Sequence, residues 1–215
     1  MTTQPEQPLH RSHRFVRFIF GRSGDYVWEL RYQFLICLVL FVSSLTMGFY
    51  LGNSLSVTLL EELMGQLPDL ESMSYPMIFL FIVGNNIFKG FLWMLLGLIF
   101  GIPPLLFVAI NGFVVGWVAY DVSIKNSLNF AIVALTPHGV IEIPTFLICM
   151  AAGMRLGYQL INTLRHRGSL KAELVRALRL FVMRAIPLLL LAAVIEVTIT
   201  PLLLLLLRLI PVPTL

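Results

Sequence analysis

The stretch FAIVALTPHGVIEIPTFLICMAA, residues 130–152, is apolar at most positions and carries His138 and Glu142 near its middle. It is long enough to cross the hydrocarbon core of a bilayer, which takes about 20 residues of helix. The chain is 58% hydrophobic and only 12% charged, whereas soluble domains average about 25% charged residues. The sequence therefore predicts an all-α fold, a polytopic transmembrane helical bundle of about five spans, one or more of them broken or re-entrant. The other predicted spans are residues 33–51, 76–100, 104–119 and 185–207.

Polar segments divide the chain between these spans. We expect residues 1–31 to form a basic, arginine-rich arm and residues 32–210 to form a single transmembrane domain. Within that domain, residues 52–75 combine acidic side chains with an apolar stripe at helical spacing, which indicates an amphipathic helix on the outer surface. Residues 155–184 are strongly basic, and their leucines at four-residue spacing predict an amphipathic helix on the cytoplasmic surface.

The distribution of positive charge predicts how the chain is oriented. The arm and residues 155–184 are rich in arginine, whereas residues 52–75 contain no Lys or Arg. The positive-inside rule then places the N-terminus and both basic segments in the cytoplasm, with the chain in the cell membrane. Because the basic residues adjoin apolar spans, they indicate contact with membrane lipids and not with nucleic acid. The predicted headgroup contacts are Arg165, Arg167, Lys171, Arg176 and Arg179.

Polar and ionisable side chains recur near the middle of four predicted spans. A charged side chain at the bilayer centre costs roughly 2.5–3.5 kcal/mol, so such groups should turn towards one another inside the bundle. We expect a shared intramembrane cluster in which a lysine pairs with one carboxylate and the other carboxylate is protonated or hydrogen-bonded. The alternative is that these groups only hold helices together. The set is Asn85, Asn86, Lys89, Asn111, His138, Glu142 and Glu196.

His138 and Glu142 lie four residues apart and therefore share one face of a helix. With Glu196 they form a weak candidate for a three-ligand metal site. The histidine pair flanking a glutamate that marks zinc-protease helices is absent from the sequence. The pattern favours a hydrogen-bonded structural or gating group, and no cofactor is predicted.

Helix-breaking residues surround this pair and recur in the last span. A proline removes a backbone hydrogen bond, and the freed groups must find partners when the helix lies in lipid. The pattern predicts a kink or a re-entrant loop, and it also fits the broken helices with which transporters bind substrate. The predicted breaks are Pro137, Gly139, Pro144 and Pro201.

Three pairs of glycines four residues apart indicate close helix packing, because they let two backbones approach. The packing can be within the chain or across a homo-oligomer, for which a dimer is favoured. The pairs are Gly97 with Gly101, Gly112 with Gly116, and Gly153 with Gly157.

The run LTPHGVIEIP at residues 135–144, followed by AAGMRLG at 151–157, resembles the signature of the stage II sporulation protein M family. The run AAVIEVTITP at 192–201 fits as well, as do the Asn85-Asn86 pair and the Asn111-Gly112 step, and the resemblance covers about residues 76–205. In spore-forming bacteria the family's namesake works in a septal membrane complex with two peptidoglycan-degrading enzymes, and it is not itself known as an enzyme. The resemblance therefore implies a scaffold or membrane-remodelling role with membrane or cell-envelope protein partners.

Three functions follow as hypotheses. A non-enzymatic scaffold predicts a dry, fully paired polar cluster. A transporter or channel for a small solute, ion or lipid, using Glu142 and Glu196, predicts a water-accessible cavity at that depth. An intramembrane hydrolase using His138 and Glu142 predicts a bound metal. An exposed apolar groove that reaches the cluster would favour lipid handling.

Overall fold

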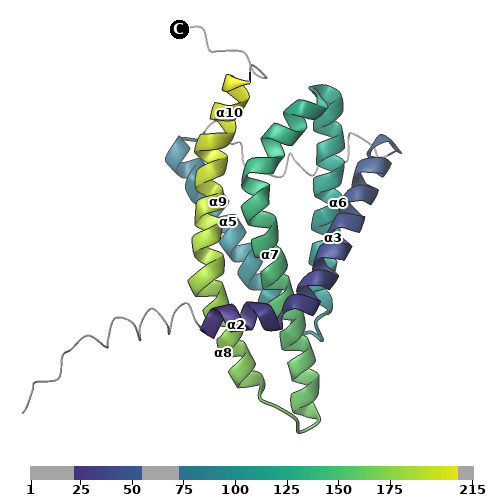
Figure 1. Cartoon of the computed structure of the whole chain (residues 1–215), viewed down its shortest axis with the longest axis vertical. Coiled ribbons are helices and arrows are strands. Elements are labelled where there is room, and N and C mark those ends of the chain that lie inside the picture. The colour runs from purple at the N-terminus through teal and green to yellow at the C-terminus, as the bar shows by residue number, and fades with distance from the viewer. Residues whose placement is uncertain (1–21, 55–72, 208–215) are drawn as a thin grey trace, which may run out of the picture.

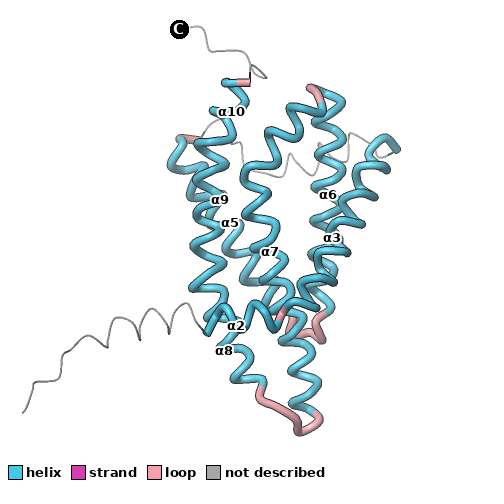
Figure 2. Tube along the Cα trace, in the orientation of Figure 1, coloured by secondary structure: helices cyan, strands magenta, loops and turns pink. Residues whose placement is uncertain are grey.

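The structure, a computed structural model, describes residues 22–54 and 73–207. Within these ranges the secondary structure is helical throughout, joined by short turns (Figure 2). Five segments are long and apolar enough to cross a membrane: Arg31–Ser54, Tyr75–Leu96, Ile102–Lys125, Gly139–Leu164 and Leu170–Leu206. The prediction of a polytopic transmembrane helical bundle is thus confirmed. Most of the basic arm and of the outer amphipathic segment lies outside the described residues.

The five spans run alternately up and down in one bundle (Figure 1). Their apolar composition suits this arrangement, because an α-helix rises about 1.5 Å per residue and roughly 20 residues therefore cover the hydrocarbon core. The helices are α2 (Arg22–Glu29), α3 (Arg31–Leu51), α5 (Tyr75–Leu96), α6 (Ile102–Lys125), α7 (Leu128–Leu164), α8 (Leu170–Leu180), α9 (Ile186–Val194) and α10 (Thr200–Leu206).

Helix α7 occupies the centre of the bundle and contacts α3, α5, α6, α8, α9 and α10. Its middle section is the most deeply buried part of the chain that the structure describes, with Cys149, Met150, Ala151, Ala152 and Leu156 fully inaccessible. Small side chains at several of these positions let the surrounding helices approach α7 closely. The polar residues carried by α7 are therefore held against several helices at once.

The predicted helix breaks are bends and π-helical turns in continuous helices. Helix α7 continues through Pro137 and Pro144, and its first part leans towards α6 in Figure 1. The fifth span contains π-helical turns at Phe181–Ala185 and Ile195–Ile199, and the second of these ends two residues before Pro201. A wider turn accommodates the proline ring, which would otherwise meet the carbonyl four residues earlier.

Residues 155–184 differ from the predicted single surface helix. Helix α7 continues to Leu164, the chain turns, and α8 runs back into the bundle as the start of the fifth span (Figure 1). The turn forms because His166 and Gly168 adopt positive φ angles of 56° and 86°, and the Ser169 side chain then caps α8 by accepting the Ala172 N–H at 3.3 Å. We call this α7–α8 turn the hairpin tip, residues 164–169.

Helix α2 falls inside the predicted arm, yet it packs on the bundle. Tyr26 and Leu30 are 2% and 1% exposed, and α2 contacts α3 and α8. It crosses the lower end of the bundle in Figure 1 at a steep angle to the spans. The end of the molecule that carries α2 is called the α2 end below.

The predicted packing glycines bring helix backbones together within the chain. A Cβ atom on Gly97 would overlap the backbone of Gly153, and one on Gly157 would overlap Gly101. This pairing locks the end of α5 to α7, and Gly101 also needs its positive φ of 75° for the turn into α6.

The third glycine pair packs α6 against α3. A Cβ atom on Gly112 would lie 2.7 Å from the Phe41 carbonyl oxygen, and one on Gly116 would overlap the Leu45 carbonyl. All three pairs thus make contacts inside one protomer.

Replacing Gly116 by Ala should destabilise the bundle, because the added methyl meets the backbone of α3 and not a movable side chain. Overpacking of this kind costs about 1–3 kcal/mol. Gly84→Ala is the matched control, since a Cβ there meets no described atom within 4 Å; alanine should leave stability unchanged or raise it slightly. Thermal unfolding in detergent, followed by circular dichroism, compares the two. Equal melting temperatures would contradict the close approach of α3 and α6.

Candidate functional site

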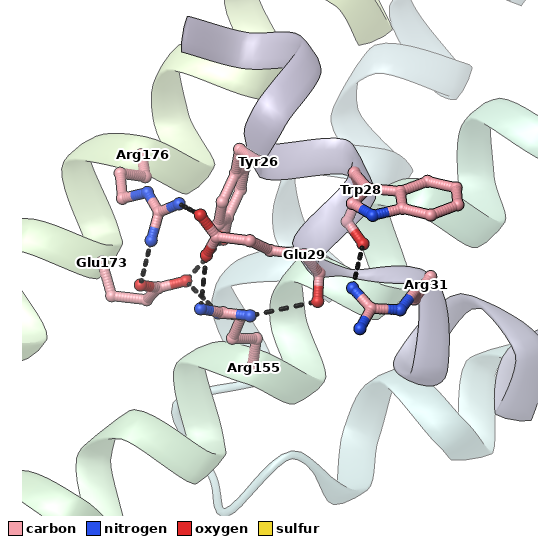
Figure 3. Close-up of polar contacts among 7 residues, drawn as sticks. All are labelled: Tyr26, Trp28, Glu29, Arg31, Arg155, Glu173 and Arg176. Atoms are coloured by element: carbon pink, nitrogen blue, oxygen red, sulfur yellow. Dashed lines mark hydrogen bonds and ion pairs between the residues drawn. The ribbon is translucent and has the colours of Figure 1, made fainter.

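An ionic network ties α2 to α7 and α8 at the α2 end of the bundle. Its members are Tyr26 and Glu29 from α2, Arg155 from α7, and Glu173 and Arg176 from α8 (Figure 3). The last turns of α7 and the first turns of α8 lie together at the α2 end, which brings their side chains beneath α2.

Two guanidinium groups and two carboxylates alternate in this network. Arg155 contacts Glu29 at 2.7 Å and Glu173 at 2.8 Å, and it also donates to the Glu29 backbone carbonyl at 3.2 Å. Arg176 pairs with Glu29 and lies 3.4 Å from Glu173. Each arginine therefore bridges both acids, and the four charges balance.

Tyr26 fills the space between the two arginines. Its hydroxyl donates to Glu173 at 2.8 Å, and the Arg176 guanidinium lies 4.4 Å from the centre of its ring. Burial, reinforced by the Glu173 charge, raises the pKa of Tyr26. The phenol therefore stays protonated and acts as a hydrogen-bond donor to the least exposed acid of the network, Glu173, whose side chain is 8% exposed.

The hydrogen bond from Arg176 holds the pKa of Glu29 below its usual range, and the positive charges of Arg176 and Arg155 add to this while burial opposes it. Glu29 thus remains ionised at neutral pH and keeps α2 attached to both arginines. Since its side chain is 40% exposed, solvent screens the pair and limits its contribution to stability.

Sequence reasoning missed this network. Arg176 was expected to contact lipid headgroups, but the structure places it between Glu29 and Glu173 because the hairpin turns α8 back beneath α2. The signal that could have found the network is Glu173, the single acid of the basic segment 155–184, together with Glu29 in the arginine-rich arm.

The structure brings part of the predicted intramembrane set together around Glu142. The Asn86 side chain of α5 donates a hydrogen bond to the Glu142 carboxylate, and Lys89 and Glu196 lie close enough to act on it electrostatically. Asn86 is buried at 7% exposure, whereas Lys89 is exposed on the side of α5. Thirteen residues of α7 separate Glu142 from Arg155, about 20 Å of helix, which puts Glu142 well inside the spans.

A small cavity adjoins Glu142 between α3, α6 and α7. Its volume is about 70 Å³, and Asn111 and Glu142 are the polar residues that line it among apolar ones. Asn85 is half-buried on α5. The His138 side chain, for which the sequence offers a metal-binding role, lies outside what the structure describes. Among the described residues, no three His, Cys, Asp or Glu side chains gather as metal ligands.

An apolar groove of about 600 Å³ runs along the first half of α7, facing α3 and α6. It begins at Leu128 and passes Gly139 to reach Pro144. Val115 and Ile143 line both this groove and the small cavity. Hydrocarbon could therefore approach from the side to within one residue layer of Glu142.

Removing one acid from the ionic network should destabilise the protein measurably. Glu173→Gln leaves two guanidinium groups facing one carboxylate, and hydrogen bonds to charged groups are worth about 1.5–3 kcal/mol. Lys125→Gln is the control, because Lys125 pairs with Asp121 on the surface while its own side chain is 53% exposed; such pairs contribute under about 1 kcal/mol. Denaturant or thermal unfolding of the purified protein measures both changes, and a loss no larger than that of the control would show that the network is not a structural clamp.

The contribution of Glu29 should vanish in acid. A carboxylate with a lowered folded pKa stabilises fully above its unfolded value of about 4.3, and this contribution is lost as pH falls through the folded pKa. The melting temperatures of wild type and Glu29→Gln should therefore differ by a constant amount between pH 7 and pH 5.5. They should converge below about pH 4.3. A constant difference down to pH 3 would refute the assigned pairing of Glu29.

Comparison with known proteins adds family information. The family model for stage II sporulation protein M matches residues 37–201. An uncharacterized protein of Methanocaldococcus jannaschii, MJ0793, is 28% identical over 175 residues, which cover 80% of this chain and 96% of the relative. No solved structure matches the chain significantly. The family match spans α3 to α10, including the helices that surround Glu142. The chain therefore belongs to the stage II sporulation protein M family.

Proposed function

We propose that this protein is a non-enzymatic membrane scaffold that positions other components of a membrane-remodelling assembly. One observation carries the proposal: Glu142 accepts a hydrogen bond from Asn86 and lies near Lys89, both of the neighbouring helix α5, and the cavity beside it measures only about 70 Å³. That volume holds a few water molecules at most. An arrangement of this kind fixes helices relative to one another and offers no passage for a solute.

The α2 end supports the same function. The ionic network joins the first described helix to the hairpin formed by α7 and α8, so segments 126 and 147 positions apart in the sequence are held together at one surface. Close backbone contacts of the three glycine pairs hold α5 against α7 and α6 against α3. A rigid frame with exposed outer faces is what a scaffold requires to present a constant surface to partners.

The proposal includes a location and an assembly. We place the protein in the cell membrane with the α2 end in the cytoplasm, because the hairpin tip and α8 concentrate arginines there. We further propose a homo-oligomer, with a dimer favoured, that works with membrane or cell-envelope proteins. Because the three glycine pairs pack inside the chain, the oligomer must use other surfaces.

A second candidate function is lipid handling, and the apolar groove favours it. The groove follows α7 from Leu128 and is separated by one layer of residues from the small cavity beside Glu142. A lipid chain could lie in it while a polar group reaches Asn111 or Glu142. Transport of other solutes has no comparable support from the described cavities.

Glu142→Gln separates the two functions. If the protein is a scaffold, the change weakens the interaction of Glu142 with Lys89 and should lower the free energy of unfolding by about 1–3 kcal/mol. In that case, liposomes that contain the wild-type protein should exchange lipids between leaflets no faster than protein-free liposomes. Asp121→Asn, at a surface pair, is the control and should alter neither property. If instead the wild type exchanged fluorescent lipids and Glu142→Gln abolished the exchange at unchanged stability, lipid handling would replace the scaffold.

A further inference from the structure

Helix α3 presents an apolar face to the outside of the bundle. The exposed side chains recur at three- and four-residue spacing, which places them on one side of the helix, whereas Cys37, Phe41 and Gly48 are buried on the other side. Tyr32 and Tyr50 lie at the two ends of the exposed face. The exposed apolar residues between them are Leu35, Ile36, Val39, Val42 and Met47.

The spacing of these two tyrosines matches the thickness of a membrane. Tyr50 follows Tyr32 by eighteen positions, which corresponds to about 27 Å of helix and is close to the roughly 30 Å of a hydrocarbon core. Tyrosine and tryptophan collect at both boundaries between hydrocarbon and headgroups, because their rings are apolar and carry one polar group. The match therefore places Tyr32 at the boundary on the α2 end of the molecule.

Arg31 is held against two aromatic rings at this boundary. Its guanidinium lies 5.4 Å from the ring centre of Trp28 and 4.5 Å from that of Tyr32. It donates one hydrogen bond to the Trp28 backbone carbonyl at 3.2 Å and one to the Tyr32 hydroxyl at 3.4 Å (Figure 3 shows the first). Trp28 and Tyr32 are 71% and 64% exposed, so the three side chains form one surface outside the bundle.

The charge of Arg31 is not balanced within the part of the chain that the structure describes. No acidic side chain of residues 22–54 or 73–207 forms an ion pair with it, and the neighbouring Glu29 is engaged by Arg155 and Arg176. A guanidinium has five N–H donors, of which Arg31 uses two. The remaining donors suit an anion with several oxygen atoms, and a guanidinium binds two phosphate oxygens at once.

We propose that Trp28, Arg31 and Tyr32 bind the phosphate of a phospholipid whose acyl chain lies along the exposed face of α3. Arg31 supplies the positive charge and the hydrogen bonds, and the two rings border the headgroup. The apolar face begins at Leu35, about 6 Å along the helix from Arg31, so the phosphate and the chain of one molecule can be bound together. The sequence did not single out Arg31 among the basic residues expected to contact headgroups.

This site extends the proposed scaffold function. The inner side of α2 is attached to the bundle through Tyr26 and Glu29. A phospholipid bound by Trp28 and Arg31 would attach its outer side to the membrane surface. The ionic network would then be held at a fixed depth below the headgroups, where a scaffold meets its partners.

The first test compares Arg31→Gln with Arg167→Gln, which removes the same charge from the exposed hairpin tip. The full chain is purified in detergent, and the binding of phosphatidylglycerol and of diacylglycerol, which lacks phosphate, is measured by native mass spectrometry. Thermal unfolding confirms that both variants fold as the wild type does.

We expect Arg31→Gln to bind phosphatidylglycerol about 10-fold more weakly, which corresponds to about 1.4 kcal/mol. Arg167→Gln should change the affinity less than about 3-fold, because the tip offers a charge without the adjoining apolar face of α3. Diacylglycerol should bind the wild type and Arg31→Gln equally, since it has no phosphate for Arg31 to bind.

The second test measures the depth of Trp28 in a bilayer and does not alter Arg31. The fluorescence of the wild type minus that of Trp28→Phe isolates the emission of Trp28, and the exposed position makes this substitution mild. The protein is placed in phosphatidylglycerol vesicles with bromine atoms on the acyl chains. Bromine near the headgroup should quench Trp28 more than bromine near the terminal methyl group.

Several results would overturn the site. Equal losses in Arg31→Gln and Arg167→Gln would mean that only overall charge attracts the lipid. Displacement of phosphatidylglycerol by millimolar inorganic phosphate would mean that the acyl chain contributes nothing. Stronger quenching by the deep bromine atoms, or by iodide in the water, would place Trp28 away from the headgroups. None of these outcomes depends on Glu142, so the scaffold proposal and this site can fail separately.

Discussion

A charged group that leaves water needs a partner, and in a helical membrane protein that partner usually belongs to a different helix. This requirement sorts the charges of the present chain into two levels. At the α2 end, Arg155 and Arg176 each bridge Glu29 and Glu173. About 20 Å further along α7, Glu142 accepts a hydrogen bond from Asn86 and lies near Lys89. Both levels are organised by α7, which supplies a residue to each.

The central position of α7 follows from its small residues and glycines. Gly153 and Gly157 accept the end of α5 at backbone distance, and alanines next to them remove the bulk that would hold other helices away. A long helix that carries two prolines survives there because tertiary packing on several sides compensates for the missing hydrogen bonds. The first part of α7 leans towards α6, and residues of α3, α6 and this part of α7 line the apolar groove.

The two ends of the bundle suggest a division of labour within the proposed scaffold. The α2 end is polar and held by the ionic network, and a pocket of about 690 Å³ opens there between α2 and α8. The opposite half is apolar and opens to the side through the groove. A protein of this design would be anchored at the membrane surface through its α2 end and would contact hydrocarbon or an apolar partner through the half that carries the groove. Its family membership rests on the sequence match over residues 37–201, whereas the positions of the pocket and the groove are known from the structure.

The sequence by itself determined the membrane-helical class, the five spans and the family, because apolar runs of sufficient length and a specific local motif need no knowledge of distant contacts. It also identified the glycines, Glu142 and Asn86 by their local context. Only the tertiary structure decided which helix each glycine meets, that α8 turns back beneath α2, and that Glu29 and Arg176 are neighbours although 147 positions apart. Such contacts depend on how whole helices pack and turn, and local periodicity carries no information about that.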